Sequence, residues 1–244
     1  MAINARWHAA HPMPKRPTVD QRIRWHEQHQ RHCGCRPIPA KLAALMTRAE
    51  DSPIVVRGLL KTDWPAIERL FGPNGACGGC WCMYWRSPSR SAFEQIQGAR
   101  ARGKLRRLVT TGAARGILAF QGDEPVGWCS FGPRTDFPNT ENKPSYAVDD
   151  ADQIWSVNCF FVRRGHRRKG VSGLLLACAI DEARRQGAKT LEAYPTVVRP
   201  GTRQADAFVF KGTLPLFERA GFRVVQRINP GSPLVRLALR AGRR

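Results

Sequence analysis

A basic, glycine-containing turn between a strand pattern and a helix pattern could bind an anion. Five Arg or Lys side chains lie within residues 163–169, directly before an amphipathic segment that begins at Val171. Backbone N–H groups at the start of a helix carry partial positive charge, and glycine lets a ligand approach the backbone closely. We therefore expect a phosphate or pyrophosphate to bind at Gly170 and Gly173. A solvated basic loop is the alternative interpretation.

The glycine spacing of this turn separates it from two common nucleotide loops. It contains neither Gly-x-x-x-x-Gly-Lys-Ser/Thr nor Gly-x-Gly-x-x-Gly, so neither a nucleoside triphosphatase nor a dinucleotide-binding protein is indicated. Residues 167–172, Arg-Arg-Lys-Gly-Val-Ser, instead resemble the acetyl-CoA pyrophosphate loop of the GNAT superfamily of N-acetyltransferases, Arg/Gln-x-x-Gly-x-Gly/Ala, with Ser172 in the last position. Residues 125–130 resemble the second half of the family's central hairpin, and residues 216–222 resemble its last helix leading into the final strand. These landmarks follow one another in the same order as in the family. Residues 78–86, Gly-Gly-Cys-Trp-Cys-Met-Tyr-Trp-Arg, resemble a segment of one bacterial branch.

This resemblance implies a fold class, a reaction and a co-substrate. The fold would be GNAT-like α/β (α+β), with a mixed, mostly antiparallel central sheet, a splayed strand pair and flanking helices. The enzyme would be an acetyl-CoA-dependent N-acetyltransferase that moves the acetyl group to a primary amine of unknown identity, by direct attack in a ternary complex. Backbone N–H groups of Phe161 and Val162 would stabilise the oxyanion. The resemblance places the coenzyme on Phe161, Val162, Arg167, Arg168, Lys169, Gly170, Val171, Ser172 and Gly173.

The resemblance leaves the acid and the base of the reaction open. Phe217 stands in the last helix where many family members carry a tyrosine, and it cannot donate a proton to the leaving thiolate. Tyr194, Tyr84 or water would donate it instead. Glu192 lies on the same face of a short strand as Tyr194 and is the candidate general base. A structural or solvated carboxylate is the alternative for Glu192.

Aromatic residues and cysteines crowd the segment 77–85. In the resembled family the loop after the first helix lies over the acceptor pocket, so we expect the aromatic residues to cover that pocket, with simple packing as the alternative. These residues are Trp81, Tyr84 and Trp85. The cysteines are Cys77, Cys80 and Cys82. Their spacing invites zinc, but no second Cys pair or His stands at zinc-finger spacing nearby, and we expect no metal there.

A second group of possible metal ligands lies near the N-terminus: His26, His29, His32, Cys33 and Cys35. The three imidazoles recur at every third residue, so on a helix they drift around the axis instead of sharing one face. A basic docking helix is the preferred interpretation, and a metal or redox role is the alternative. The prediction from sequence is therefore that neither group binds a metal.

Strand and helix patterns alternate from residue 53 onward and must position these side chains. Before them, Thr18 and Gln21 form a capping-box pattern that predicts a helix over residues 19–32, and residues 41–50 are predicted as a short helix or a linker. The alternation beyond residue 53 favours an α/β domain. The expected strands are 54–60, 116–120, 125–131, 153–162, 190–194, 222–227 and 234–239. One expected helix begins near residue 62, and three others cover 91–109, 171–186 and 212–220.

The net charge of the 244-residue chain is +21, from 40 Lys plus Arg and 19 Asp plus Glu, which points to a polyanionic partner. The basic turn predicts that this polyanion is coenzyme A. A nucleic-acid-binding protein, with residues 100–107 and 163–169 on phosphates, is an alternative, although no helix-turn-helix, zinc-finger or RNP signature supports it. A GNAT fold that binds acyl-CoA as a sensor without turnover is a further alternative.

The chain is predicted to consist of a basic, His- and Cys-containing extension, residues 1–50, and an acetyltransferase domain, residues 51–244. No apolar run approaches the ~20 residues of a spanning helix, and residues 1–30 lack a signal-peptide pattern. We therefore expect a cytoplasmic protein with no membrane partner. Its partners would be acetyl-CoA and an amine acceptor, chosen by loops at 72–90, 133–150 and 195–211. The oligomeric state, monomer or homodimer, stays open.

Overall fold

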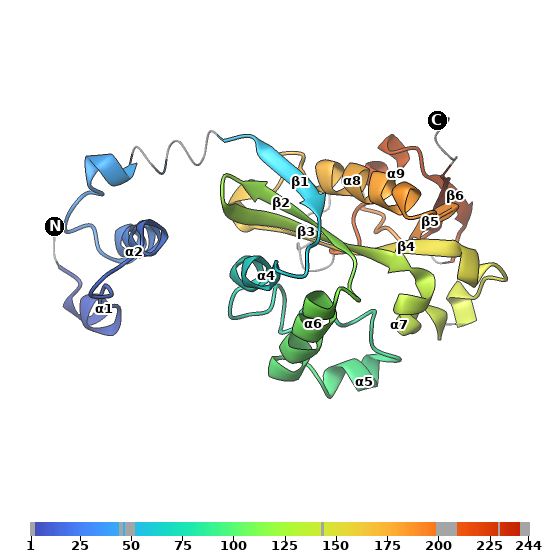
Figure 1. Cartoon of the computed structure of the whole chain (residues 1–244), viewed down its shortest axis with the longest axis horizontal. Coiled ribbons are helices and arrows are strands. Elements are labelled where there is room, and N and C mark those ends of the chain that lie inside the picture. The colour runs from blue at the N-terminus through green and yellow to red at the C-terminus, as the bar shows by residue number, and fades with distance from the viewer. Residues whose placement is uncertain are drawn as a thin grey trace. The chain divides into compact units, whose positions relative to one another are not determined.

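The computed structural model describes residues 3–43, 46, 52–142, 144–198, 209–228 and 230–239. The chain forms two compact units, Met1–Pro53 and Ile54–Arg244. The first unit is helical in its described part, and the second carries a β-sheet (Figure 1). None of the helices in the described ranges is long and apolar enough to cross a membrane.

The first unit contains helices α1 (Ala5–Ala10) and α2 (Val19–His32). The predicted bounds of α2 are confirmed, because Gln21 N–H donates to the Thr18 hydroxyl at 3.2 Å and Thr18 N–H donates to the Gln21 side chain at 2.9 Å. Helix α1 was not expected from the sequence. Asn4 caps it, since its side-chain oxygen accepts the Trp7 N–H at 3.0 Å. In the predicted helix or linker at 41–50, residues 41–43 are helical, and 44–45 and 47–50 lie outside the described residues.

A seven-stranded mixed sheet, as far as the chain is described, organises the second unit. Its strands are β1 (Ile54–Gly58), β2 (Gly116–Gln121), β3 (Glu124–Pro133), β4 (Ile154–Val162), β5 (Thr190–Ala193), β6 (Arg223–Gln226) and β7 (Leu234–Ala238). They are ordered β1-β2-β3-β4-β5-β7-β6, with β4 and β5 parallel and the other neighbours antiparallel. The predicted mixed, mostly antiparallel α/β fold is confirmed.

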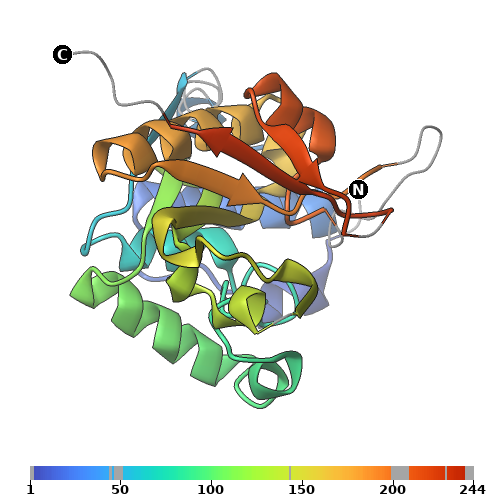
Figure 2. The ribbon, with the colours of Figure 1, turned by 90° about the vertical axis from the view of Figure 1, so that its right-hand side faces the viewer.

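Helices cover both faces of this sheet (Figures 1 and 2). They are α4 (Trp64–Phe71), α5 (Arg90–Glu94), α6 (Ala99–Thr111), α7 (Pro138–Glu141), α8 (Val171–Arg185) and α9 (Leu214–Arg219). The prediction of one helix over 91–109 is wrong, because α5 and α6 are separate. Gly98 breaks the run: its φ is +86°, and its N–H donates to Gly79 O at 2.9 Å instead of to a helical carbonyl.

Two apolar clusters fill the spaces on either side of the sheet. Helix α8 packs Leu175 and Leu176 against one face, and α4 packs Ile67 and Leu70 into the cluster on the other. Side chains of β4 alternate between the two clusters, as the pleat of a strand requires. Residues at the end of β4 therefore reach both faces of the sheet.

Strands β4 and β5 diverge after a short paired stretch. They pair from Ile154 opposite Thr190 to Val157 opposite Ala193, whereas β4 runs on to its last residue without a described β5 partner. The register of β3 against β4 also shifts at this point, which is typical of a bulge that bends a strand. The splayed strand pair that the resemblance implied is thus present.

Candidate active site

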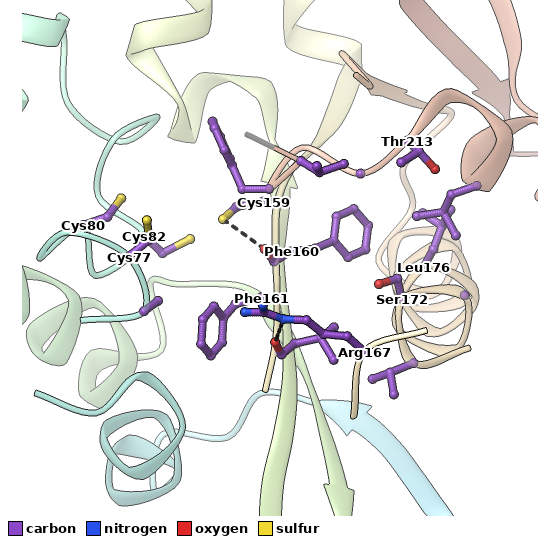
Figure 3. A pocket seen from close by; sticks show the side chains of 18 of the residues that line it. Cys77, Cys80, Cys82, Cys159, Phe160, Phe161, Arg167, Ser172, Leu176 and Thr213 are labelled. Carbon is purple, nitrogen blue, oxygen red and sulfur yellow. Dashed lines mark hydrogen bonds between the residues drawn. The ribbon is translucent and has the colours of Figure 1, made fainter. Parts of the chain in front are cut away.

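A cleft of about 1650 Å³ opens where β4 and β5 diverge. Phe160 and Phe161 of β4 lie along it (Figure 3), and Val162 is also part of its lining. The turn before α8 lies on one side of these residues and Cys77, with the segment that follows it, lies on the other. The cleft therefore has walls on both faces of β4.

The basic turn, residues 163–170, is suited to an anion. After β4 ends, a 3-10 turn (Arg164–His166) leads to α8, whose first turn holds no acidic residue. Gly170 precedes α8 with φ +80° and supplies no side-chain cap, and a Cβ added to it would meet no atom within 4 Å. The N–H groups of Val171 and Ser172 find no acceptor inside the helix, whereas Gly173 N–H donates to Gly170 O at 2.9 Å. They present partial positive charge at the wall of the cleft.

Hydrogen bonds hold this turn in place. Arg167 Nε–H donates to Val162 O at 2.8 Å, and Arg167 lines the cleft (Figure 3). His166 Nε2 lies 2.8 Å from Gln121 Oε1, which links the turn to the end of β2. The predicted coenzyme residues that line the cleft are Phe161, Val162, Arg167, Arg168, Gly170, Val171, Ser172 and Gly173. Lys169, the remaining predicted coenzyme residue, is exposed to solvent and is not part of the lining.

The backbone of β4 turns alternate amides toward the cleft. Arg163 N–H donates to β3 at 2.9 Å, whereas Phe160 N–H donates in the other direction, to Phe210 O at 2.6 Å. Successive amides of an extended strand point to opposite sides, so Phe161 N–H faces β3 and Val162 N–H faces the cleft. Of the two predicted oxyanion donors, we therefore keep Val162. Phe161 contributes its ring to the lining.

The wall opposite the basic turn is apolar and rich in thiols. Its described lining includes Cys77, Cys80, Cys82, Cys159, Tyr84 and Phe93. Arg90 and Gln97 add polar groups. Asp181 is the carboxylate among the described lining residues; it belongs to α8 and accepts a hydrogen bond from Arg184 at 2.8 Å. The thiol-rich wall thus offers no carboxylate, among its described residues, to an ammonium group.

The three predicted acceptor aromatics do not share one role. Tyr84 lines the cleft. Trp81 is only 4% exposed, with its ring 5.7 Å from that of Trp64, and Trp85 is 5% exposed in a separate apolar cluster. Both tryptophans are core residues because their loop folds back against the sheet, so packing, the alternative weighed above, describes them better. Phe93 takes part in the lining instead, and no motif in its basic segment signals it. Of the predicted acceptor loop at 195–211, residues 199–208 lie outside the described part.

Cys82 has the most distinctive environment in this wall. Trp128 Nε1–H donates to its sulfur at 3.3 Å. Hydrogen bonds from Cys159 and Trp128 and the charge of Arg86 lower the pKa of Cys82 to about 7, although burial acts in the opposite direction. In Cys80, by contrast, burial raises the pKa to about 11. The pKa values of the two thiols are thus shifted in opposite directions, and Cys82 is the one that loses its proton more readily.

The sequence matches the acetyltransferase (GNAT) family over residues 81–222. The chain belongs to this family. It is accordingly an acyltransferase, and acetyl-CoA is its co-substrate. The cleft fits that molecule, because Arg167, Arg168 and the start of α8 suit the pyrophosphate and the gap between the strands leads from them to the opposite wall.

Several solved structures of acetyltransferases are similar to this GNAT chain. An N-acetyltransferase from Staphylococcus aureus Mu50 is 16% identical, with a TM-score of 0.48 over 78% of this chain and 100% of that one. A putative acetyltransferase from Salmonella typhimurium, solved with acetyl-CoA, is 17% identical, with a TM-score of 0.47 over 77% and 94%. The PaiA N-acetyltransferase from Thermoplasma acidophilum, solved with coenzyme A, is 13% identical, with a TM-score of 0.45 over 76% and 99%. No match was found among curated proteins.

Glu192 and Tyr194 of this GNAT protein lie outside the cleft lining. Glu192 is 0% exposed, and its Oε1 accepts hydrogen bonds from Arg134, from Ser156 Oγ at 2.8 Å and from Tyr194 OH at 3.1 Å. Burial and the charge of Glu192 raise the pKa of Tyr194, which makes it a weaker acid. A buried carboxylate held by a guanidinium cannot reach an acceptor amine. We therefore assign a structural role to Glu192 and Tyr194, in place of the predicted roles of general base and general acid.

Phe217, at the position of the family's tyrosine, is also a core residue here. It is fully buried, with its ring 6.1 Å from that of Phe160 and 5.0 Å from that of Phe222. Tyr84 is the tyrosine found on the described lining of the cleft. It is consequently the remaining candidate for a side-chain proton donor in this GNAT enzyme.

Proposed function

We propose that the Ile54–Arg244 unit moves the acetyl group of acetyl-CoA to a primary amine by direct attack in a ternary complex. The observation that supports this proposal is the pair of walls on the two faces of β4. One wall is the basic turn, and the other is lined by thiols and aromatic rings. Two substrates can therefore occupy separate sites and meet at the gap between β4 and β5.

Residues on both sides of β4 have distinct tasks in this proposal. Acetyl-CoA supplies an activated acetyl thioester. Arg167 and the N-terminal amides of α8 bind its pyrophosphate through charge-assisted hydrogen bonds. Val162 N–H donates to the acetyl oxygen and stabilises the negative charge that develops there. Tyr84 donates a proton to the sulfur that leaves.

The thiol-rich wall favours an amine that is carried on an apolar body. The rings of Tyr84 and Phe93 offer apolar contact area, and no carboxylate of the described lining lies on this wall. An ammonium group would lose its hydration there without gaining a carboxylate as counter-ion. The acceptor amine therefore has to be neutral when it attacks, and a base must take its proton.

Cys82 is the group that we propose as this base. A group with a pKa near the working pH is best suited to proton transfer, and the pKa of Cys82 is lowered to about 7. Below pH 7 the protonated thiol cannot accept a proton, so kcat/KM should fall as the pH drops through 7. In Cys82→Ala we expect kcat to fall by about 10²–10⁴-fold and this limb of the pH profile to disappear.

Cys80→Ala is the matched control for this prediction. Cys80 lines the same wall, but its pKa is raised to about 11, so it is protonated across the neutral range. The control should keep the wild-type pH profile. Circular dichroism and the melting temperature of both variants separate a loss of folding from a loss of chemistry. An unchanged profile in folded Cys82→Ala would argue against the role as base.

Thiol release from acetyl-CoA in the presence of a panel of amines tests the proposed function. We expect release to depend on the amine, and primary amines on apolar or aromatic carriers should be the best acceptors. Mass spectrometry should find the acetyl group on the amine. Tight binding of acetyl-CoA without amine-dependent release by any member of the panel would contradict the proposal and favour a sensor.

A further inference from the structure

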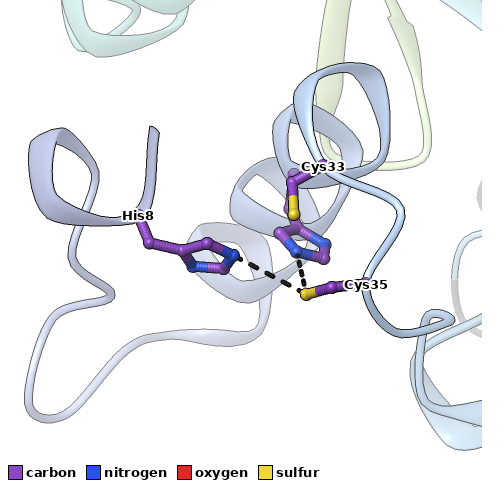
Figure 4. A group of neighbouring side chains, drawn as sticks. His8, Cys33 and Cys35 are labelled. Atoms are coloured by element: carbon purple, nitrogen blue, oxygen red, sulfur yellow. Dashed lines mark hydrogen bonds between the residues drawn. The ribbon is translucent and has the colours of Figure 1, made fainter. Parts of the chain in front are cut away.

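Two histidines and two cysteines of the Met1–Pro53 unit converge on one point. His8 comes from α1, His29 from α2, and Cys33 and Cys35 follow the end of α2. One possible ligand atom of each lies within 4.8 Å of those of the other three. Figure 4 shows the side chains of His8, Cys33 and Cys35 pointing toward one another. Segments far apart in the sequence thus bring four soft or borderline ligands together.

The distances are close to those of a tetrahedral zinc site. Cys35 Sγ lies 3.2 Å from His29 Nε2 and 3.7 Å from His8 Nε2. Zn–S bonds of about 2.3 Å and Zn–N bonds of about 2.0–2.1 Å at tetrahedral angles separate the ligand atoms by about 3.3–3.8 Å. Two cysteines and two histidines also complete the coordination without a water molecule, as in structural zinc sites.

We propose that His8, His29, Cys33 and Cys35 bind one structural Zn²⁺ ion. Two thiolates balance the charge of the ion, so the site is neutral overall. Asn4 N–H donates to Cys33 Sγ at 3.2 Å and supports the negative charge on that sulfur. The side chain of Asn4 caps α1, which carries His8, so the same residue orients two of the ligands.

Aromatic rings enclose the site. The ring of Trp25 stacks on His29 with centroids 4.9 Å apart and an angle of 7° between the planes. The ring of Trp7 lies 5.6 Å from His29 on a tilted plane. His29 itself is 0% exposed. These rings fix the orientation of the imidazole and keep water away from it, as the surroundings of a structural metal do.

The small apolar core of this unit explains why it would need a metal. Among its described residues, the buried side chains are Trp7, His26, His29, Cys33 and Leu42. Two of these are proposed ligands. The unit spans residues 1–53, and natural domains below about 70–80 residues often add disulfides or a structural metal to a small core. All eight cysteines are free thiols, so a zinc ion is the remaining cross-link between α1, α2 and the segment after α2.

Metal analysis of the full-length protein tests the proposal. Protein purified under reducing conditions without chelator should contain about one zinc per chain by inductively coupled plasma mass spectrometry. Replacing Zn²⁺ with Co²⁺ should give the visible bands of tetrahedral cobalt and a thiolate-to-cobalt charge-transfer band. Reduced protein that contains no zinc and takes up neither ion would overturn the proposal.

Single substitutions locate the ion. Cys35→Ser and His8→Asn should weaken zinc binding by more than about 100-fold, since loss of an outer-shell partner alone costs about 10–100-fold. His32→Asn, one helical turn from His29, and Cys77→Ser, in the other cysteine segment, are the matched controls and should keep the zinc. Zinc that stays in Cys35→Ser and leaves with Cys77→Ser would overturn the assignment. If the ligand variants do not fold, the cobalt spectrum of the wild type decides, because it counts the thiolates directly.

Discussion

We expect Glu192→Gln to lower the free energy of unfolding by about 3–5 kcal/mol, while the turnover rate per folded molecule stays close to that of the wild type. The substitution leaves the guanidinium of Arg134 buried without its counter-charge, and Arg134, like Glu192, is 0% exposed. A neutral amide cannot offset the cost of keeping that charge away from water. Urea denaturation measures the change, with the turnover rate taken well below the melting temperature.

The position of Glu192 explains why the effect should be large. Ser156 of β4, Glu192 of β5 and Arg236 of β7 are neighbours in register, so the carboxylate lies at a junction of three strands. Arg236 Nη2 is 3.8 Å from Glu192 Oε2 and 3.0 Å from Asp150. Removing one charge therefore disturbs hydrogen bonds and ion pairs on both sides of β5.

Glu68→Gln is the matched control for charge loss. It breaks an ion pair in which the Glu68 side chain is 39% exposed and the Arg102 side chain is 48% exposed. The free energy of unfolding should therefore fall by at most about 1 kcal/mol. The double variant Arg134→Met/Glu192→Met should be less destabilised than Glu192→Gln, because no buried charge of the pair is left without a partner. If well-folded Glu192→Gln turned over at least about 100-fold more slowly than the wild type, as expected for loss of a general base, Glu192 would return to that role.

Arg167→Met should weaken acetyl-CoA binding by about 10- to 100-fold. Hydrogen bonds to charged groups contribute about 1.5–3 kcal/mol, and each 1.4 kcal/mol is about a factor of ten in affinity. Arg167 lines the cleft beside the start of α8, where the pyrophosphate is proposed to bind, and methionine keeps most of its apolar stem. Isothermal titration calorimetry measures the affinity directly.

Two comparisons show whether the effect comes from the phosphates. S-acetylpantetheine lacks the pyrophosphate, so its affinity should be the same for the wild type and for Arg167→Met. Arg106→Met removes an equal charge from the exposed face of α6, outside the cleft, and should leave both affinities unchanged. An equal loss for both ligands in Arg167→Met would contradict the phosphate contact. The hydrogen bond from Arg167 to Val162 O would then be the cause.

The features that could be predicted from the sequence are local ones. The basic turn, the helix that follows it and the capping box at Thr18 each depend on residues within a few positions of one another. The strand pattern placed β2, β3 and β4 correctly because alternation and turn residues are also local signals. The splayed strand pair was predicted from the resemblance to the family and not from these local signals.

The parts that could not be predicted depend on distant partners. Glu192 is explained by Arg134, 58 positions away along the chain, and nothing in the strand sequence distinguishes a paired carboxylate from a general base. The proposed zinc site depends on His8, which lies 27 positions from Cys35 on a helix too short to show periodicity. Spacing along α2 therefore drew attention to His26 and His32, which are not in the cluster.

The start of α8 has no side-chain cap, and this connects binding of the coenzyme with the stability of the folded protein. Gly170 supplies no side-chain cap, and its φ of +80° disfavours the residues that would supply one, so the first amides of the helix stay open to a ligand. In the proposed complex, the phosphate oxygens of the coenzyme act as the cap. Any ligand that binds the folded state alone adds about 2.7 kcal/mol of stability at 100 times its Kd. The melting temperature of this acetyltransferase thus becomes a gauge of how much of it is loaded with coenzyme.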